Sequence, residues 1–185
     1  ITRVRAPRIA VLGTDCALGK RTTARLLVEA CRQDGVSAEM IYTGQTGWMQ
    51  GGRFGFVLDS TPNDFVSGEL EHACTSCDEI ARPDVMFLEG QSALRNPSGP
   101  CGAELLLSAQ ARAVVLQHAP ARTHYKGHDD DDAWRIPPLH EEIALVAAYG
   151  ARVIAVTLNT EDLDEAGARA AARELEARLG LPVIL

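Results

Sequence analysis

Residues 8–23 read RIAVLGTDCALGKRTT, and this stretch decides the fold of the chain. A short apolar run leads into a glycine-bracketed loop that ends in Gly19-Lys20, and a segment of helical period follows. Such a turn wraps backbone N–H groups around phosphate oxygens, adds a lysine ammonium and lies at the positive end of the next helix. The segment therefore predicts a phosphate-binding loop between a strand and a helix.

The loop departs from the usual spacing G-x-x-x-x-G-K-[ST] at two positions. Thr14 occupies the first glycine position, with Gly13 one residue earlier, and Arg21 occupies the hydroxyl position. Thr22 and Thr23 are therefore the candidates for a metal-binding hydroxyl. The alternative interpretation is an ordinary glycine-rich turn that carries a surface lysine.

Bulk composition indicates a single domain over residues 1–185, long enough to bury a substantial core. The net charge of -7 and the lack of a basic patch argue against a nucleic-acid partner. No apolar run approaches the roughly 18 residues of a membrane span, and no signal peptide opens the chain, so we expect a cytoplasmic protein without a membrane partner. The five cysteines read as reduced thiols.

Apolar runs of strand length alternate with segments of helical period, which predicts a three-layer α/β domain of the P-loop NTPase type. Its mostly parallel sheet has helices on both faces. We expect strands over 8–13, 38–43, 84–89, 112–118, 152–158 and 182–185, and helices over 20–34, 62–80, 102–110, 138–149 and 163–179. Ligands of such sheets bind beyond the carboxyl ends of the strands. The loops to search are therefore 13–19, 44–61, 90–101, 118–137 and 159–162.

Two acids lie where a cation near the phosphate loop would need them. Glu89 ends the apolar strand 85–88, and a buried carboxylate there is costly unless it is paired or bound to a cation such as Mg²⁺. Asp64 falls in the first turn of the helix after Pro62, with Asp59 as a nearby substitute. The competing interpretations are a loop cap for Glu89 and a favourable helix dipole for Asp64.

The remaining candidates follow from their positions at strand ends and in the long loops. His118 ends a strand at the ligand edge and is a candidate base. The candidates for cofactor binding are Gly13, Thr14, Asp15, Gly19, Lys20, Thr22, Thr23 and Asn159. The candidates for substrate binding are Gln45, Thr46, Gln91, Arg95, Asn96 and Ser98. The stretch 91–102 offers Arg and N–H donors to a carboxylate or a second phosphate, and its alternative role is a rigid turn.

Three segments together, GTDCALGKRTT, PND before a helix and DVMFLEGQ, resemble the dethiobiotin synthetase family. That resemblance implies that Lys20 binds phosphates and that Thr22, Asp64 and Glu89 hold Mg²⁺. The family carries Lys-Pro at the end of its second strand, whereas this chain has Thr43-Gly44. The difference disfavours carboxylation of that family's substrate.

A longer resemblance covers essentially the whole chain. The segments IYTGQTGW, VLDSTPNDFVSGELEHA, EGQSALRNPSGPCGAELLLS, VVLQHAP and YGARVIAVTLNTE are similar to the carboxyl-terminal P-loop domain of the DgcN-type D-glutamate N-acetyltransferase family. This resemblance implies acetyl transfer from acetyl-CoA to the amine of an acidic amino acid, with Lys20, Glu89 and His118 as catalytic candidates. It also implies a Rossmann-like domain ahead of residue 1, in keeping with the start at Ile1.

Two other functions stay open from the sequence. One is ATP-dependent and Mg²⁺-dependent activation of a carboxylate, in which ATP takes the place of acetyl-CoA. The other is a nucleotide-sensing module without enzymatic activity. For either enzyme we expect a small-molecule substrate and a homo-oligomer.

Overall fold

The structure is a computed structural model that describes residues 1–128 and 131–185. Within these residues a seven-stranded sheet runs in the order β3-β2-β4-β1-β5-β6-β7, and its paired strands are parallel. The strands are β1 (Arg8–Gly13), β2 (Ala38–Tyr42), β3 (Phe54–Gly55), β4 (Val85–Glu89), β5 (Ala113–His118), β6 (Arg152–Leu158) and β7 (Val183–Ile184). The predicted α/β fold with a parallel sheet is therefore confirmed.

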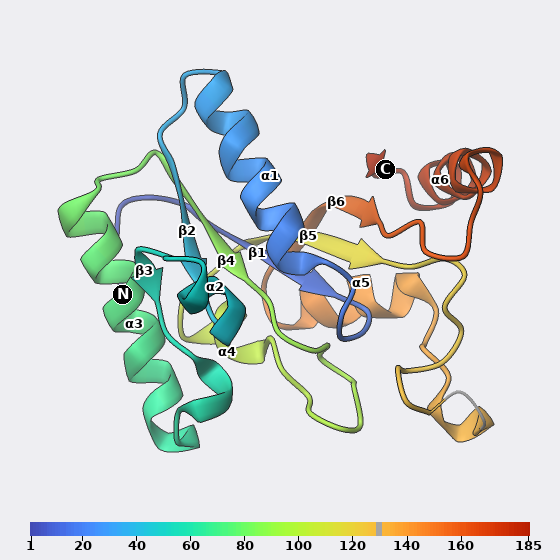
Figure 1. The fold of residues 1–185 in the computed structure, drawn as a ribbon, viewed down its shortest axis with the longest axis horizontal. Coiled ribbons are helices and arrows are strands. Elements are labelled where there is room, and N and C mark those ends of the chain that lie inside the picture. The colour runs from blue at the N-terminus through green and yellow to red at the C-terminus, as the bar shows by residue number, and fades with distance from the viewer. Residues whose placement is uncertain (129–130) are drawn as a thin grey trace.

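Helices lie on both sides of this sheet (Figure 1). They are α1 (Lys20–Gln33), α2 (Gln45–Met49), α3 (Asn63–Ile80), α4 (Ala103–Leu107), α5 (Leu139–Ala148) and α6 (Glu165–Leu179), with short 3-10 turns at Leu58–Ser60 and Asp132–Trp134. The helix predicted over 102–110 is shorter than expected. The predicted loop 44–61 contains α2, β3 and a 3-10 turn, which are too short to show a hydrophobic period.

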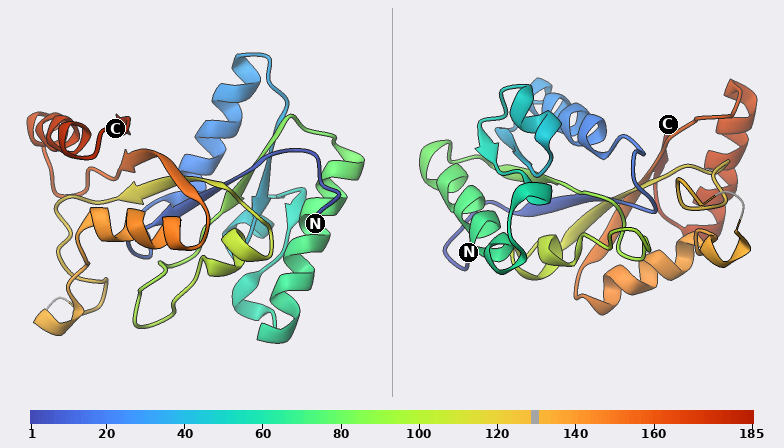
Figure 2. Two further views of the ribbon diagram at one scale, coloured as in Figure 1. Left: turned by 180° about the vertical axis from the view of Figure 1, so that it is seen from behind. Right: turned by 60° about the horizontal axis from the view of Figure 1, so that its bottom comes forward.

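The core has two parts, because the buried strands present apolar side chains to both faces of the sheet. Val11 of β1 packs with Ala24 and Val28 of α1 on one face. Leu12 belongs to the larger cluster on the other face, to which α3, α4 and α5 contribute. Helix α6 lies at the β6–β7 end of the sheet, as both views in Figure 2 show. No helix in the described ranges is long and apolar enough to span a membrane.

The sheet order places the phosphate loop at the centre of the carboxyl edge. Strand β1 lies between β4 and β5, and from β1 the order extends through β4 to β2 on one side and through β5 to β6 on the other. This is the switch point at which ligands of open α/β sheets bind. Gly90 brings the end of β4 against β1, because a Cβ atom there would lie 2.3 Å from the Val11 carbonyl oxygen. Glu89 is thereby fixed beside the phosphate loop.

Candidate phosphate-binding site

The loop between β1 and α1 ends in a helix start without a cap. Gly19 precedes the helix with a left-handed φ of 96°, and α1 has neither a side-chain cap nor an acid in its first turn. Backbone bonding along the helix begins where the Thr23 N–H donates to the Gly19 carbonyl at 2.9 Å. The backbone N–H groups of residues 20–22 come before this first bond of the helix. They therefore lie at the positive end of the helix dipole. Such an end favours an anion.

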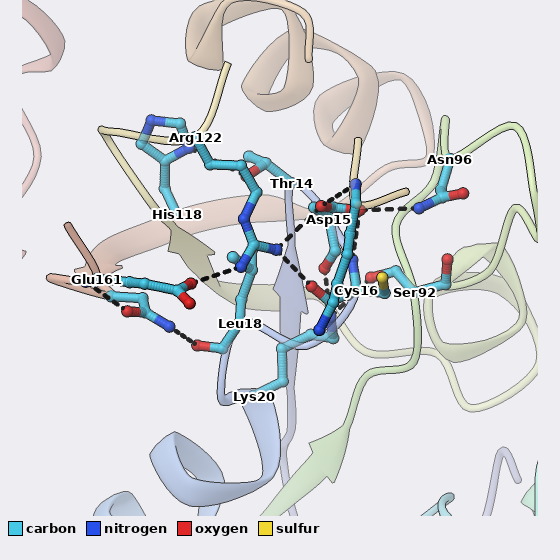
Figure 3. A network of polar contacts seen from close by, with 12 residues as sticks. Thr14, Asp15, Cys16, Leu18, Lys20, Ser92, Asn96, His118, Arg122 and Glu161 are labelled. Carbon is cyan, nitrogen blue, oxygen red and sulfur yellow. Dashed lines mark hydrogen bonds and ion pairs between the residues drawn. The ribbon is translucent and has the colours of Figure 1, made fainter. Parts of the chain in front are cut away.

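Lys20 crosses the loop with its ammonium group buried, at 5% exposure. Its Nζ donates to the carbonyl oxygens of Asp15 at 2.6 Å and Ser92 at 2.7 Å (Figure 3). An ammonium has three donors, so one N–H remains for a ligand. Burial lowers the pKa of Lys20 to about 8. Gly13 leaves room for this side chain, since a Cβ atom there would lie 3.1 Å from the lysine Cδ.

The carboxylate of Asp15 is fully buried and accepts four hydrogen bonds. Its donors are the Cys16 N–H at 2.7 Å, Asn96 Nδ2 at 2.9 Å, Arg122 Nη1 at 3.0 Å and the Lys126 N–H at 2.9 Å. These donors come from the loops after β1, β4 and β5. The Asp15 side chain, which we predicted to bind the cofactor, is thus hydrogen-bonded within the protein. It holds three loops at the carboxyl edge of the sheet together.

Arg122 extends this network to a fourth loop. Besides Asp15, its guanidinium donates to the Cys16 carbonyl oxygen at 2.9 Å and to Glu161, after β6, at 2.7 Å (Figure 3). Hydrogen bonds to both acids raise the pKa of Arg122, although burial opposes this effect. Our sequence reasoning missed Arg122. The signal available was an arginine four residues after the strand end at His118, in 118–137, one of the loops predicted to bind ligand.

The far side of the phosphate loop is fixed by β5 and β6. Thr14 Oγ1 lies 3.0 Å from His118 Nδ1, the Thr23 hydroxyl donates to Gln117, and Asn159 Nδ2 donates to the Leu18 carbonyl at 3.2 Å. Burial lowers the pKa of His118 to about 4, so its imidazole is neutral at pH 7. A group with this pKa is a weak base at neutral pH.

Glu89 is buried at the end of β4, and its carboxylate accepts the backbone N–H groups of Thr43 at 3.0 Å and Gly44 at 3.4 Å. The Thr43 hydroxyl also donates to the Glu89 carbonyl at 2.7 Å, and Gln91 Nε2 donates to that hydroxyl at 3.0 Å. The loops after β2 and β4 therefore hold one carboxylate in place. Its negative charge lies close enough to Lys20 to favour the ammonium form.

Like Gln91, the predicted substrate residues Arg95, Asn96 and Ser98 have partners within the protein. Arg95 donates to Glu142 at 2.6 Å and to Glu141 at 2.9 Å. Asn96 donates to Asp15, and its Oδ1 accepts the Ser98 N–H at 2.9 Å. Binding a substrate carboxylate through either side chain would require these contacts to break.

Other predicted residues lie on the surface around the site. Thr22 lines a groove beside α1, while Asp64 is exposed in the first turn of α3. Gln45 and Thr46 are exposed at the start of α2. Among the described residues, no group of three or more His, Cys, Asp or Glu side chains is arranged to hold a metal ion.

Asp15→Ala is expected to destabilise the fold by about 3 to 5 kcal/mol, because it leaves the Arg122 guanidinium partly buried without its carboxylate. Urea unfolding followed by circular dichroism measures this change. Glu174→Ala, at an exposed position of α6, serves as the control and should shift the unfolding free energy by less than about 0.5 kcal/mol. Equal stability of the two variants would contradict the role given to Asp15.

The comparisons with known proteins agree with this geometry. A family described as "Domain of unknown function (DUF1611_C) P-loop domain" matches residues 1–185. A D-glutamate N-acetyltransferase of Tritonibacter scottomollicae is 33% identical over 97% of this chain and 54% of its own length. Another with that name, from a Pseudoalteromonas species, is 27% identical over 96% of this chain and 53% of its own length. The chain spans about half the length of the curated relatives it matches.

Solved structures show the same fold. A crystal structure of a DUF1611 family protein from Anabaena variabilis superposes with a TM-score of 0.90 and 30% identity, over 99% of this chain and 54% of that one. An Archaeoglobus fulgidus nucleotide-binding protein in complex with ADP gives a TM-score of 0.57 at 13% identity, over 97% of this chain and 80% of that one. Since the family match covers the described P-loop architecture from end to end, the chain belongs to the DUF1611 family and contains its P-loop domain.

Proposed function

We propose that the phosphate loop binds the pyrophosphate of acetyl-CoA and that the protein transfers the acetyl group to the amine of an acidic amino acid. The observation that carries this proposal is the pairing of buried Lys20 with an uncapped α1. The Arg21 Nε atom, in the first turn of α1, is also buried without a hydrogen-bond partner. An unsatisfied buried donor is costly, and a phosphate oxygen would satisfy it.

The nucleoside half of the cofactor has a place nearby. A cavity of about 290 Å³ is lined by the loops after β5 and β6 at Ala119, Ala121–Thr123, Lys126 and Glu161–Asp162. Arg122 lines this cavity and also donates to the Cys16 carbonyl within the phosphate loop. We assign the adenosine of the cofactor to this cavity, with the Lys126 side chain as a partner for further phosphate charge.

The donors around the phosphate loop do not fit a Mg²⁺ ion. Arg21, a cation, occupies the position where a phosphate loop usually has a hydroxyl. The Thr23 hydroxyl donates its hydrogen bond to Gln117, and Thr22 lines the groove beside α1. Magnesium requires several oxygen ligands in near-octahedral geometry. Arg21 instead supplies positive charge as part of the protein. This favours a phosphate-bearing cofactor that is held without metal over the Mg²⁺-ATP of a ligase.

Acetyl transfer to an amine needs a group that accepts a proton. The cofactor supplies the acyl group as a thioester, so an N–C bond forms, the C–S bond breaks and a free thiol leaves. The attacking amine must first lose the proton of its ammonium form. We assign this proton to the Glu89 carboxylate, because Thr14 already contacts His118 Nδ1 and the low pKa of His118 makes it a weak base.

The domain predicted ahead of residue 1 stays a proposal, supported by relatives about twice as long as this chain. A homo-oligomer and a cytoplasmic location likewise stay predictions.

The acetyltransferase and its alternatives release different products. We expect protein given acetyl-CoA and D-glutamate without Mg²⁺ to release free thiol, measured by a thiol-reactive dye. Protein given ATP, Mg²⁺ and D-glutamate is expected to release no ADP. ADP release without thiol release would favour the ligase, and binding of either cofactor without turnover would favour the sensing module.

Binding of acetyl-CoA is expected to weaken as the pH rises through about 8. In our proposal the cofactor binds the ammonium form of Lys20. In the free protein, Lys20 loses this proton above its lowered pKa of about 8. Calorimetry should therefore give a constant affinity from pH 6 to 7 and a fall of roughly tenfold per pH unit well above pH 8. Lys20→Ala should bind at least roughly tenfold more weakly and lose this pH dependence. Wild-type affinity in Lys20→Ala would contradict our placement of the site.

A further inference from the structure

A groove of about 800 Å³ runs along α1, between this helix and the segment that follows β2. One wall is α1 from Thr22 to Arg32, the other is the turn 47–53, and Met40 of β2 lies between them. Helix α1 and the segment around α2 lie on the same face of the sheet (Figure 2, right). Ten residues of helix span about 15 Å, so the groove is long enough for an extended small molecule.

Three arginines and two glutamates, Glu29 and Glu39, line this groove, in a chain whose net charge is -7. Arg32 is paired with Glu39 at 3.2 Å. Arg25 and Arg53 have no carboxylate within ion-pair distance among the described residues. The groove therefore offers two guanidinium groups whose charge the described residues do not neutralise by direct pairing.

Both guanidinium groups are held in place without losing their capacity for an anion. Arg25 Nη1 reaches across the groove from α1 to Gln50 Oε1 at 3.3 Å. The Arg53 guanidinium lies 4.8 Å from the centre of the Phe54 ring, a cation–π contact that leaves its N–H edges free for a carboxylate. Two preorganised guanidinium groups match the two carboxylates of an acidic amino acid.

One residue of the groove lining, Gly47, packs beside Glu89. Gly47 lines the groove, and a Cβ atom at this position would lie 3.2 Å from Glu89 Oε2. Thr22, at the same end, lies two residues after Lys20. The Gly47 backbone thus lies between the groove and the carboxylate to which we assign the amine proton. A side chain there would collide with Tyr42, whose Cβ would lie 2.5 Å from a Cβ atom of residue 47.

We propose that this groove is the binding site of the acyl acceptor, a dicarboxylic amino acid held by Arg25 and Arg53 with its amine toward Glu89. The proposal rests on the acetyl transfer proposed above, and it moves the acceptor away from the stretch 91–98. There Arg95 is neutralised by Glu141 and Glu142, whereas the two arginines of the groove remain available.

The test measures binding of D-glutamate and of acetyl-CoA separately, by calorimetry, in Arg25→Ala, Arg53→Ala and the double variant. Each single variant should bind D-glutamate at least tenfold more weakly, and Arg25→Lys should recover part of this loss. Acetyl-CoA affinity should stay within twofold of wild type. Arg173→Ala, an exposed position on α6 outside the groove, is the matched control and should change neither affinity.

Unchanged D-glutamate binding in the double variant would overturn the assignment of the groove, and so would the absence of D-glutamate binding to wild type. These results differ from a failure of the proposed function. If the arginine variants lose D-glutamate binding but wild type neither binds acetyl-CoA nor releases thiol from it, the groove assignment is supported and acetyl transfer is contradicted.

Discussion

The buried carboxylate of Asp15 is the constraint on which the site depends. A carboxylate without solvent must be fully hydrogen-bonded, and its donors come from the phosphate loop itself and from the loops after β4 and β5. Arg122 then connects these loops to Glu161 beyond β6. Because the loop is held from the side by its neighbours, the ligand that we propose would find Lys20 and the start of α1 already in place. Such preorganisation lowers the entropic cost of binding.

Arg21 gives this phosphate loop its chemical character. Where related loops place a hydroxyl for Mg²⁺, this chain places a second cation next to Lys20. A site with fixed positive charge suits a cofactor whose phosphates serve only as a handle, because no phosphoryl group has to be transferred. In the acetyl transfer that we propose, reactivity then depends on the thioester and on the Glu89 carboxylate at the end of β4. The groove along α1 would bring the acceptor to the same place from the opposite side of Gly47.

Local sequence was enough to predict six of the seven strands described, the phosphate loop and the position of Glu89, but not the two-residue strand β3. Each depends on a strand and the residues that directly follow it, so period and spacing carry the information. The partners of Arg95 could not be predicted, because Glu141 and Glu142 are more than forty residues away on α5. The groove was missed for the same reason, since its walls come from 22–32 and 47–53 and include elements too short for a periodic signal. Asp15 was predicted to bind the cofactor, because its spacing could not distinguish a ligand contact from the hydrogen bonds to neighbouring loops that the structure shows.

Hydrogen–deuterium exchange with and without acetyl-CoA shows whether the phosphate loop binds this cofactor, because it reports on the backbone amides of the loop and of the first turn of α1. We expect acetyl-CoA to slow exchange in residues 13–22 and to leave the turn 47–53 unchanged. Protection confined to other parts of the chain, with residues 13–22 unaffected at saturating acetyl-CoA, would contradict this binding site.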